Sequence, residues 1–250
     1  MNVYMNLLNA GVDLLLRGIA LFILFFFSGY SLQIHWHPVV YWIMLFLCED
    51  LMFWLEHFVD HHVRIFWAVH VTHHSSEEYN LTTGFRSSVF MPCYRYLYFI
   101  PLALLHFRPV DILFMYAITQ IYGILVHTQS IKKVPAWIGY FLVTPAHHRV
   151  HHASNIPYLD KNMGMVLIIW DRIFGTFADE LPDEIIRYGL TKPVEHPLHP
   201  AHIVLHEWQA IGRDLRKTKS WKDRLRYLFM PPGWSHDGSS QTAKELRKKI

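Results

Sequence analysis

Histidines in the first two thirds of the chain recur at helical spacing. They form the groups His57-x3-His61, His70-x2-His73-His74 and His148-x2-His151-His152, with His127 alone between the second and third group. Positions i, i+3 and i+4 of an α-helix lie on one face within about 6 Å of each other, so each group can turn its imidazoles to the same side. Neutral imidazole binds Zn, Cu, Fe and Ni. Eight or nine imidazoles exceed the needs of one tetrahedral ion, and the spacing therefore predicts a dinuclear metal site.

The alternative for these histidines is a structural one. A lone histidine on an apolar face is usually a hydrogen-bonded structural residue, and adjacent histidines also occur in pH-sensing loops. Three groups together with His127, in a chain with 19 histidines against 20 acidic residues, favour the metal site over that alternative.

The composition is that of a membrane protein. Of 250 residues, 52% are hydrophobic, 16% are aromatic and only 17% are charged, and the mean hydropathy is positive. The only cysteines, Cys48 and Cys93, stand in apolar stretches and form no CxxC motif, so the metal ligands must be nitrogen or oxygen atoms.

Four apolar segments are each long enough to cross a hydrocarbon layer of about 30 Å as a helix. They run from about Gly18 to Trp36, Val39 to His57, Val89 to Phe107 and Val110 to His127. The first is longer than the apolar part of a signal peptide and no cleavage site follows it, so we interpret it as a spanning helix. The short link at His106–Pro109 predicts an antiparallel hairpin of the last two.

Two further segments are expected at the membrane surface. Residues 64–80 begin as an interfacial helix and continue as a polar loop, and residues 136–143 are too short to span.

Glu49 and Asp50 lie at membrane depth in the second segment, where carboxylates are functional by default. Asp50, Trp54, His57 and His61 fall at i, i+4, i+7 and i+11, one continuous helical stripe. Asp50 is therefore the predicted catalytic residue besides the metal ligands, because its carboxylate could accept an N–H from a ligating imidazole and fix the tautomer of that ring. A hydrogen bond between two helices is the alternative.

With four crossings, all histidine groups and both termini emerge on one side. Basic residues crowd the C-terminal region, as Arg216, Lys217, Lys219, Lys222, Arg224, Arg226, Lys244, Arg247, Lys248 and Lys249. They suggest contact with an anionic membrane face rather than nucleic acid, or a solvated tail. The positive-inside rule makes this side cytoplasmic. We thus expect one all-α membrane domain, 1–250, with transmembrane helices in 12–130, a cytoplasmic catalytic cap in 131–210 and a basic tail in 211–250.

A second run of histidines lies in the C-terminal region, at His196, His199, His202 and His206. Prolines break the helical phase, which leaves only His202 and His206 at i, i+4 spacing. We interpret this region as part of the cap, followed by an amphipathic segment from about Trp221 to Met230.

From about Asp50 to Asp179 the chain resembles the sterol desaturase and fatty acid hydroxylase superfamily of membrane non-haem iron enzymes. The resemblance is carried by His70-Val-Thr-His73-His74, Thr144-Pro-Ala-His147-His148-Arg-Val-His151-His152, Asp160-Lys-Asn162 and Trp170-Asp171-Arg-Ile-Phe174-Gly-Thr-Phe177, and it is nearest to the alkylglycerol monooxygenase branch. It implies two iron ions, O2 and, for that branch, a reduced pterin. The ligands that it implies are His57, His61, His70, His73, His74, His148, His151 and His152, with His127 as a further one. It also implies that residues 170–177 pack beneath the metal site.

The predicted function is hydroxylation or desaturation of a C–H bond in a membrane lipid with O2 and two electrons. No flavin, haem or Rossmann motif is present, so the electrons must come from a separate reductase, a ferredoxin- or cytochrome-like protein, or a pterin. Asp50, Asn155, Asn162 and Asp171 could tune the site. Zinc is expected to replace iron in aerobic preparations.

Three alternatives remain. Ether-lipid cleavage is the activity of the branch, although His62 stands where the branch has a glutamate. A metal transporter would need ligands near the bilayer midplane, whereas these histidines end helices on one side. A lipid-binding scaffold would have no use for aligned imidazoles.

Overall fold

A computed structural model describes residues 2–250, in which the regular structure is helical apart from two isolated β-bridges. The α-helices are α1 (Asn2–Ser28), α2 (Pro38–His62), α3 (Arg64–His74), α4 (Ile100–Leu104), α5 (Pro109–Leu125), α6 (Ala136–Phe141), α7 (Pro145–His151), α8 (Ile169–Phe174), α9 (Pro200–Leu215), α10 (Trp221–Phe229) and α11 (Ala243–Arg247). Short 3-10 turns are η1 (Thr83–Phe85), η2 (Met91–Cys93), η3 (Arg95–Phe99) and η4 (Ile156–Tyr158). The predicted all-α class is confirmed.

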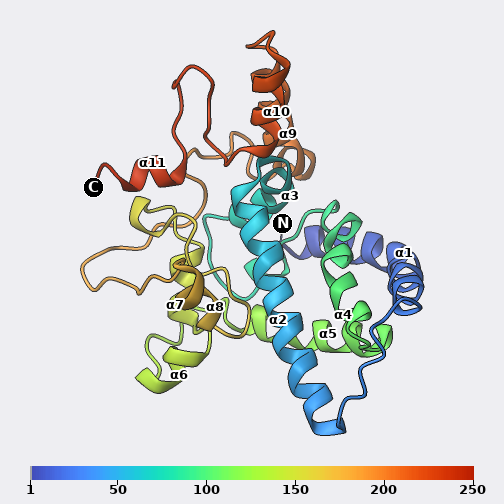
Figure 1. Ribbon diagram of the computed structural model, residues 1–250. Helices are drawn as coiled ribbons and strands as arrows, with labels where there is room; N and C mark the ends of the chain where they lie inside the picture. Colours follow the sequence, from blue (N-terminus) through green and yellow to red (C-terminus); the bar gives the residue numbers. More distant parts are fainter. Residues whose placement is uncertain (1) are drawn as a thin grey trace.

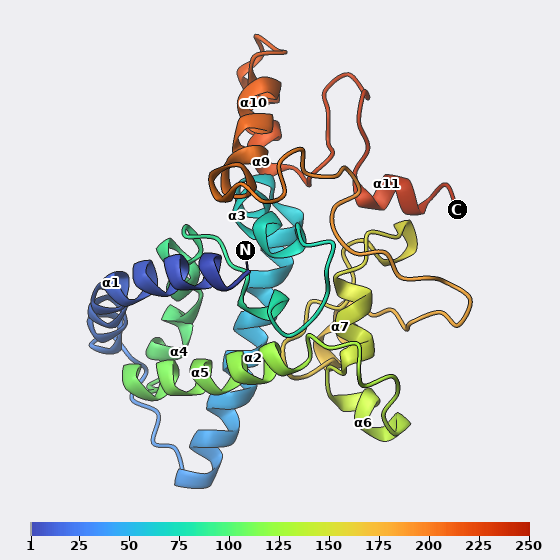
Figure 2. The ribbon, with the colours of Figure 1, turned by 180° about the vertical axis from the view of Figure 1, so that it is seen from behind.

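Helix α2 is the axis of the molecule. In Figure 1, α1, α4 and α5 lie on one side of it, α6, α7 and α8 lie on the other, and α9 and α10 lie at its C-terminal end. Helix α11 lies farther away, where it contacts η4. The reverse view in Figure 2 shows the same division. An apolar core joins α1, α2, α4 and α5, and it includes the fully buried Leu24, Leu45, Phe99, Leu102 and Ile112. Because elements pack on both sides of α2, this helix fixes their positions relative to one another.

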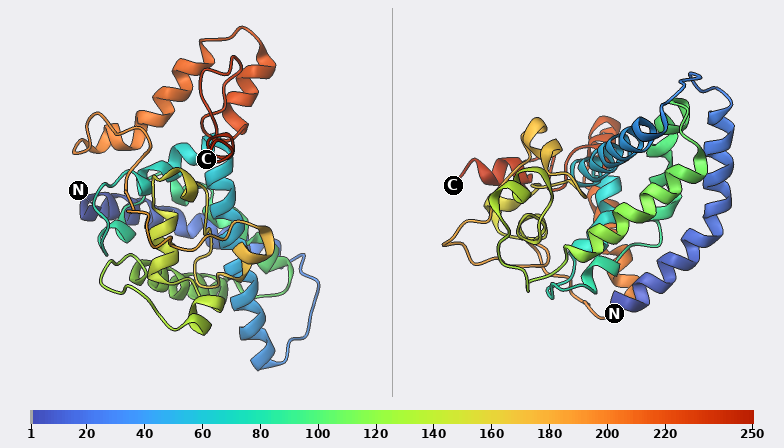
Figure 3. Two further views of the ribbon diagram at one scale, coloured as in Figure 1. Left: turned by 90° about the vertical axis from the view of Figure 1, so that its left-hand side faces the viewer. Right: turned by 90° about the horizontal axis from the view of Figure 1, so that it is seen from below.

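Helices α1 and α2 are long and apolar enough to cross a membrane, with mean hydropathies of 2.1 and 1.6 over their best windows. The first one differs from the prediction, because it begins at Asn2 and ends at Ser28 instead of running from Gly18 to Trp36. Asp13 and Arg17 form an ion pair one turn apart, and the Tyr96 hydroxyl donates to Asp13, so these charges do not end the helix. Figure 3 shows α1 along the outer edge of the molecule.

The predicted third span is wrong, because residues 89–107 do not form one helix. They run as η2, η3 and the single turn of α4. Pro92 and Pro101 each stand at the start of a new short helix, where a missing N–H costs least. Arg95 points into the protein, where its Nε donates to Glu56 of α2 at 2.9 Å and its Nη1 donates to the Tyr116 hydroxyl.

Helix α5 corresponds to the predicted fourth span, although it crosses α2 in Figures 1 and 2 instead of lying alongside it. One face of α5 is apolar and exposed at Val110, Phe114, Ile118, Ile121 and Leu125. The outward faces of α1 and of the first turns of α2 are also apolar. Exposed apolar faces of this kind are typical of contact with a membrane. Of the four predicted spans, two are continuous apolar helices of spanning length.

We expect Arg95→Met to destabilise the fold by about 3–5 kcal/mol, because it leaves the buried Glu56 carboxylate without its cation. Thermal unfolding in detergent would measure the loss. Arg226→Met is the matched control, since its pair with Asp223 is largely exposed and should contribute at most about 1 kcal/mol. Equal effects of the two substitutions would contradict the role given to the Glu56–Arg95 pair.

Candidate metal centre

The structure brings the nine histidines singled out from the sequence into two neighbouring groups. The first group contains His57, His61, His70, His74 and His151, and the second contains His73, His127, His148 and His152. Within each group, one nitrogen of every ring lies within 4.8 Å of those of all the others. All nine are buried except the half-buried His73.

Three helices supply the first group. Helix α2 provides His57 and His61 one turn apart, α3 provides His70 and His74 one turn apart, and α7 provides His151. The Nε2 atom of His70 lies 3.0 Å from that of His57 and 3.1 Å from that of His74. The Nε2 atoms of His61 and His151 are buried and have no hydrogen-bond partner among the described residues.

His127 is the centre of the second group. Its Nε2 atom lies 2.9 Å from that of His148, 3.1 Å from that of His152 and 3.3 Å from that of His73. Helix α7 is set in place by a capping box in which the Thr144 hydroxyl accepts the His147 N–H and the His147 ring accepts the Thr144 N–H. This box fixes the rotation of α7 and turns His148 and His152 toward His127.

Backbone carbonyls settle the tautomers of four rings. His57 Nδ1 lies 2.8 Å from the Met163 carbonyl, and His151 Nδ1 lies 3.0 Å from that of Lys161. In the second group, His73 Nδ1 faces the Arg86 carbonyl and His127 Nδ1 faces the Gly123 carbonyl. A carbonyl can only accept, so each Nδ1 carries the proton and each Nε2 presents a lone pair to the centre of its group.

Such lone pairs fit a metal ion. His73 and His127 face each other at 3.3 Å with no proton between their Nε2 atoms, an arrangement that repels unless a cation lies between them. Two nitrogens bound at about 2.1 Å from one ion, at a ligand angle of about 90–109°, are about 3.0–3.4 Å apart, close to the separations seen here. The nine imidazoles are therefore suited to hold two metal ions.

Burial keeps these rings neutral. It lowers the pKa of His73 to about 4 and that of His151 to about 3, and it lowers the pKa of His70, His74, His127, His148 and His152 well below the usual range. Only a neutral imidazole has a lone pair to bind a metal. The site is consequently ready for a cation at neutral pH.

Two carboxylates touch the first group from outside. Asp60 lies 3.6 Å from His70 Nδ1 and accepts a hydrogen bond from Tyr94, and Asp160 lies 3.3 Å from His61 Nδ1. Asp60 is a site residue that was not predicted from the sequence. Its position three residues after His57 on α2 was the available signal.

The predicted contact of Asp50 with an imidazole is absent from the hydrogen bonds of residues 2–250. Its carboxylate accepts from the Val166 and Leu167 N–H groups and from Trp170 Nε1, at 2.9–3.0 Å. Asp50 lies on the predicted helical stripe, but about two turns from His57, where the segment before α8 is its nearest partner. Residues 170–177 do pack against α2, with Phe174 stacked on Trp54 at 4.4 Å between ring centroids.

Histidines outside the two groups have other partners. His62 stacks on Phe58, and His147 takes part in the capping box, so it is His148 that belongs to the second group. His202 and His206 lie on α9, with ring centroids 6.0 Å apart, and join neither group. Asn155 holds residues 184–187 through three hydrogen bonds and contacts no histidine of the two groups within the described chain.

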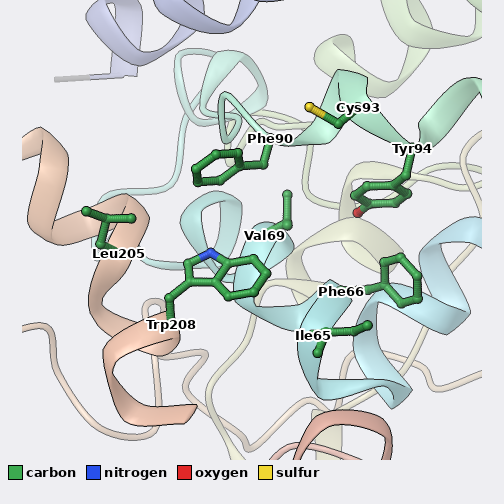
Figure 4. A pocket seen from close by; sticks show the side chains of 8 residues that line it. All are labelled: Ile65, Phe66, Val69, Phe90, Cys93, Tyr94, Leu205 and Trp208. Atoms are coloured by element: carbon green, nitrogen blue, oxygen red, sulfur yellow. The ribbon is translucent and has the colours of Figure 1, made fainter. Parts of the chain in front are cut away.

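An apolar cavity of about 450 Å³ lies on the other side of α3 (Figure 4). Its walls are Ile65, Phe66, Val69, Phe90, Cys93, Tyr94, Leu205 and Trp208. Two polar atoms interrupt this lining. The Tyr94 hydroxyl donates to Asp60, and Trp208 Nε1 is buried and has no hydrogen-bond partner within residues 2–250.

Comparison with known proteins gives a consistent set of relatives. The profile of the fatty acid hydroxylase family matches residues 42–176. Human alkylglycerol monooxygenase is 36% identical over 216 residues, which are 84% of this chain and 46% of the human protein. The alkylglycerol monooxygenase of Danio rerio is 34% identical over 249 residues, 94% of this chain and 53% of the relative. Lathosterol oxidase of Mus musculus is 28% identical over 137 residues, 53% of this chain and 43% of the relative.

The chain thus spans about half the length of the alkylglycerol monooxygenases that it matches. No solved structure matches it.

The two groups should behave as separate metal sites. We expect protein loaded with iron without oxygen to hold about two ions, and His151→Ala and His148→Ala each to hold about one, because each removes a ligand from a different group. His206→Ala, outside both groups, is the control and should still hold two. Metal analysis of the purified proteins gives the answer, and full loading of both ligand variants would refute the assignment.

Proposed function

The chain belongs to the fatty acid hydroxylase family, and we propose that it is a membrane-bound di-iron oxygenase that hydroxylates a C–H bond of a lipid. The observation that carries this proposal is the pair of buried histidine groups, whose Nε2 atoms face one another at 2.9–3.3 Å. The broader assignment to the membrane lipid oxidoreductases rests on the family and on relatives named alkylglycerol monooxygenase and lathosterol oxidase.

The nine histidines would hold two iron ions, which supply the binding of O2 and the two-electron oxidation of an unactivated C–H bond. The overall balance is R–H + O2 + 2 e⁻ + 2 H⁺ → R–OH + H2O. Zinc fits the same nitrogen donors and would occupy the site in aerobic preparations without supporting this reaction. The two electrons come from a separate donor protein or from a reduced pterin.

The residues of the chain have three tasks in this reaction. The carbonyls of Lys161, Met163, Arg86 and Gly123 hold imidazoles in the tautomer that binds metal. Burial of both groups excludes bulk water, which strengthens every electrostatic interaction in the site. Asp60 accepts a hydrogen bond from Tyr94 and lies next to His70, so it places a carboxyl group close to the proposed metal positions.

The apolar cavity is the proposed place for the hydrocarbon chain of the substrate. Its volume of about 450 Å³ and its aliphatic and aromatic walls suit an alkyl chain. One of those walls, Tyr94, connects it through Asp60 to His70. The free N–H of Trp208 could donate to an ether or ester oxygen, which an amphiphilic lipid offers beside its chain.

Ether-lipid cleavage is the second candidate for the activity. It is favoured by the alkylglycerol monooxygenases, which are 34–36% identical over most of this chain. Hydroxylation of the first alkyl carbon next to an ether oxygen gives a hemiacetal, which releases a fatty aldehyde. His62, which occupies a position where that branch has glutamate, stacks on Phe58 outside the metal groups, so it offers no ligand of its own.

We further propose that the chain crosses the membrane several times and that its metal centre faces the cytoplasm. The apolar faces of α1, α2 and α5 support the first point. The basic residues of α9, α10 and the segment between them, such as Arg213, Lys219 and Arg224, support the second, since they lie at the same end of α2 as His61.

A tag after Ile250 should be cut by protease added to the cytoplasmic side of sealed vesicles, and protection of that tag would refute this orientation.

Cells that express the chain under oxygen should contain a lipid with one additional oxygen atom, or a fatty aldehyde if an ether is the substrate. Untargeted lipidomics measures both products. A His148→Ala/His151→Ala variant, with one ligand removed from each group, is the control and should produce neither. An unchanged lipidome with iron-loaded protein and a working electron donor would contradict the proposed function.

Filling the cavity should weaken binding of long-chain substrates. Val69→Trp would displace at least two methylene groups, and at about 0.8 kcal/mol each the affinity should fall by about fifteen-fold. The metal content should not change, because Val69 contacts the cavity and not the ligating nitrogens. Val40→Trp, on the exposed start of α2, is the matched control. An unchanged KM of Val69→Trp for a long-chain lipid would show that the hydrocarbon chain of the lipid binds elsewhere.

A further inference from the structure

The irregular residues between η4 and α8 form a loop, 160–164, that touches three histidines of the first group. Within it, the Lys161 carbonyl faces His151 Nδ1, the Met163 carbonyl faces His57 Nδ1, and the Asp160 carboxylate faces His61 Nδ1. The 160–164 loop therefore holds two rings at once, and a shift of its backbone would move both.

Asp171, on α8, anchors this loop. Its Oδ1 atom accepts the Met163 N–H at 2.7 Å and its Oδ2 atom accepts the Gly164 N–H at 2.8 Å. Oδ1 also accepts from Trp54 Nε1 of α2 at 3.2 Å and from the Thr176 hydroxyl at 2.5 Å. The side chain is completely buried. One carboxylate thus ties the peptide groups around Met163 to the same helix that carries His57, three residues after Trp54.

The peptide groups of the 160–164 loop are also held in place by the conformation of Asn162 and by close packing at Gly164. Asn162 has a positive φ of 56°, and its side chain bonds the His147 and Ala178 carbonyls and the Ala178 N–H. A Cβ on Gly164 would lie 2.6 Å from the Leu167 carbonyl and 3.0 Å from Asp171 Oδ2. Only glycine fits between Asp171 and the loop, so the carboxylate meets the backbone directly.

The second group does not use this loop. His73 and His127 are held by the carbonyls of Arg86 and Gly123, and no described residue of 160–164 hydrogen-bonds a histidine of that group. The orientation of each group therefore depends on a different stretch of backbone.

We propose that Asp171 is a positioning residue that acts through the Met163 peptide on His57, and so sets the metal affinity of the first histidine group alone. This inference rests on the proposed function only in that both histidine groups bind metal; it is independent of the substrate and of the electron donor.

Asp50 offers a matched comparison. Like Asp171 it is completely buried, and it accepts two backbone N–H groups and one tryptophan N–H from the same segment. Its backbone partners are Val166 and Leu167, and neither carbonyl of these residues faces a histidine of the two groups. Loss of Asp50 should loosen the segment in general without turning the Met163 carbonyl away from His57.

The test is metal binding by purified full-length Asp171→Asn, with no turnover required. An amide in place of the carboxylate points an NH2 group at the Met163 or Gly164 N–H, so the loop must move. Titration of the metal-free protein with Fe²⁺ under nitrogen should show an affinity about ten- to a hundred-fold lower at one site, with the other unchanged. Asp50→Asn should affect that site less. Titration with Co²⁺ adds a spectrum that reports the ligand geometry of each site.

Trp54→Phe is the second variant, in case Asp171→Asn does not fold. It removes one donor to Asp171 but keeps the aromatic stacking on Phe58 and Phe174, and it should give a smaller loss at the same site. Equal losses at both metal sites, or equal losses in Asp171→Asn and Asp50→Asn, would reduce Asp171 to a structural residue and overturn the inference. A wild-type protein that binds no metal would instead overturn the proposed function, and this inference with it.

Discussion

Mutual repulsion between imidazole lone pairs is the constraint on which the rest of the structure depends. Nine neutral rings converge on two points inside the protein, and at least the rings whose Nδ1 atoms face carbonyls must present bare lone pairs to their neighbours. A cation at each point turns that repulsion into attraction. The helices, the capping box of α7 and the 160–164 loop all hold the rings in an arrangement that a cation at each point would stabilise.

The helical part of this arrangement could be predicted from the sequence. Spacings of three and four residues place ring pairs on single faces of α2, α3 and α7, and the structure brings the eight histidines with this spacing together with His127. His127 has no neighbour at helical spacing, and it was included because of its position between the groups and the family resemblance. The choice of His148 rather than His147 as a ligand also agrees with the structure, where His147 caps its helix.

The irregular part could not be predicted in the same way. A carbonyl that orients a histidine belongs to every residue type, so Lys161, Met163 and Arg86 carry no signature of this task. Asp50 was placed on the correct helical face, yet the partner on that face is a backbone segment more than a hundred residues away. The third predicted span failed because hydropathy averages over Pro92 and Pro101, which divide the segment, and over Arg95, whose charge is matched by Glu56 from another helix.

Asp60 and Asp160 would make the two proposed metal positions electrically unequal. Imidazole brings no charge, so two divalent ions would leave their full positive charge in a buried, weakly polarisable environment. Both carboxylates lie against rings of the first group, at His70 and His61, and none of the described salt bridges reaches the second group. Negative charge nearby favours the more oxidised state of an ion, whereas its absence favours the reduced state. Two identical iron ions would therefore have different reduction potentials, and an incoming electron would be held first at the site of His73, His127, His148 and His152.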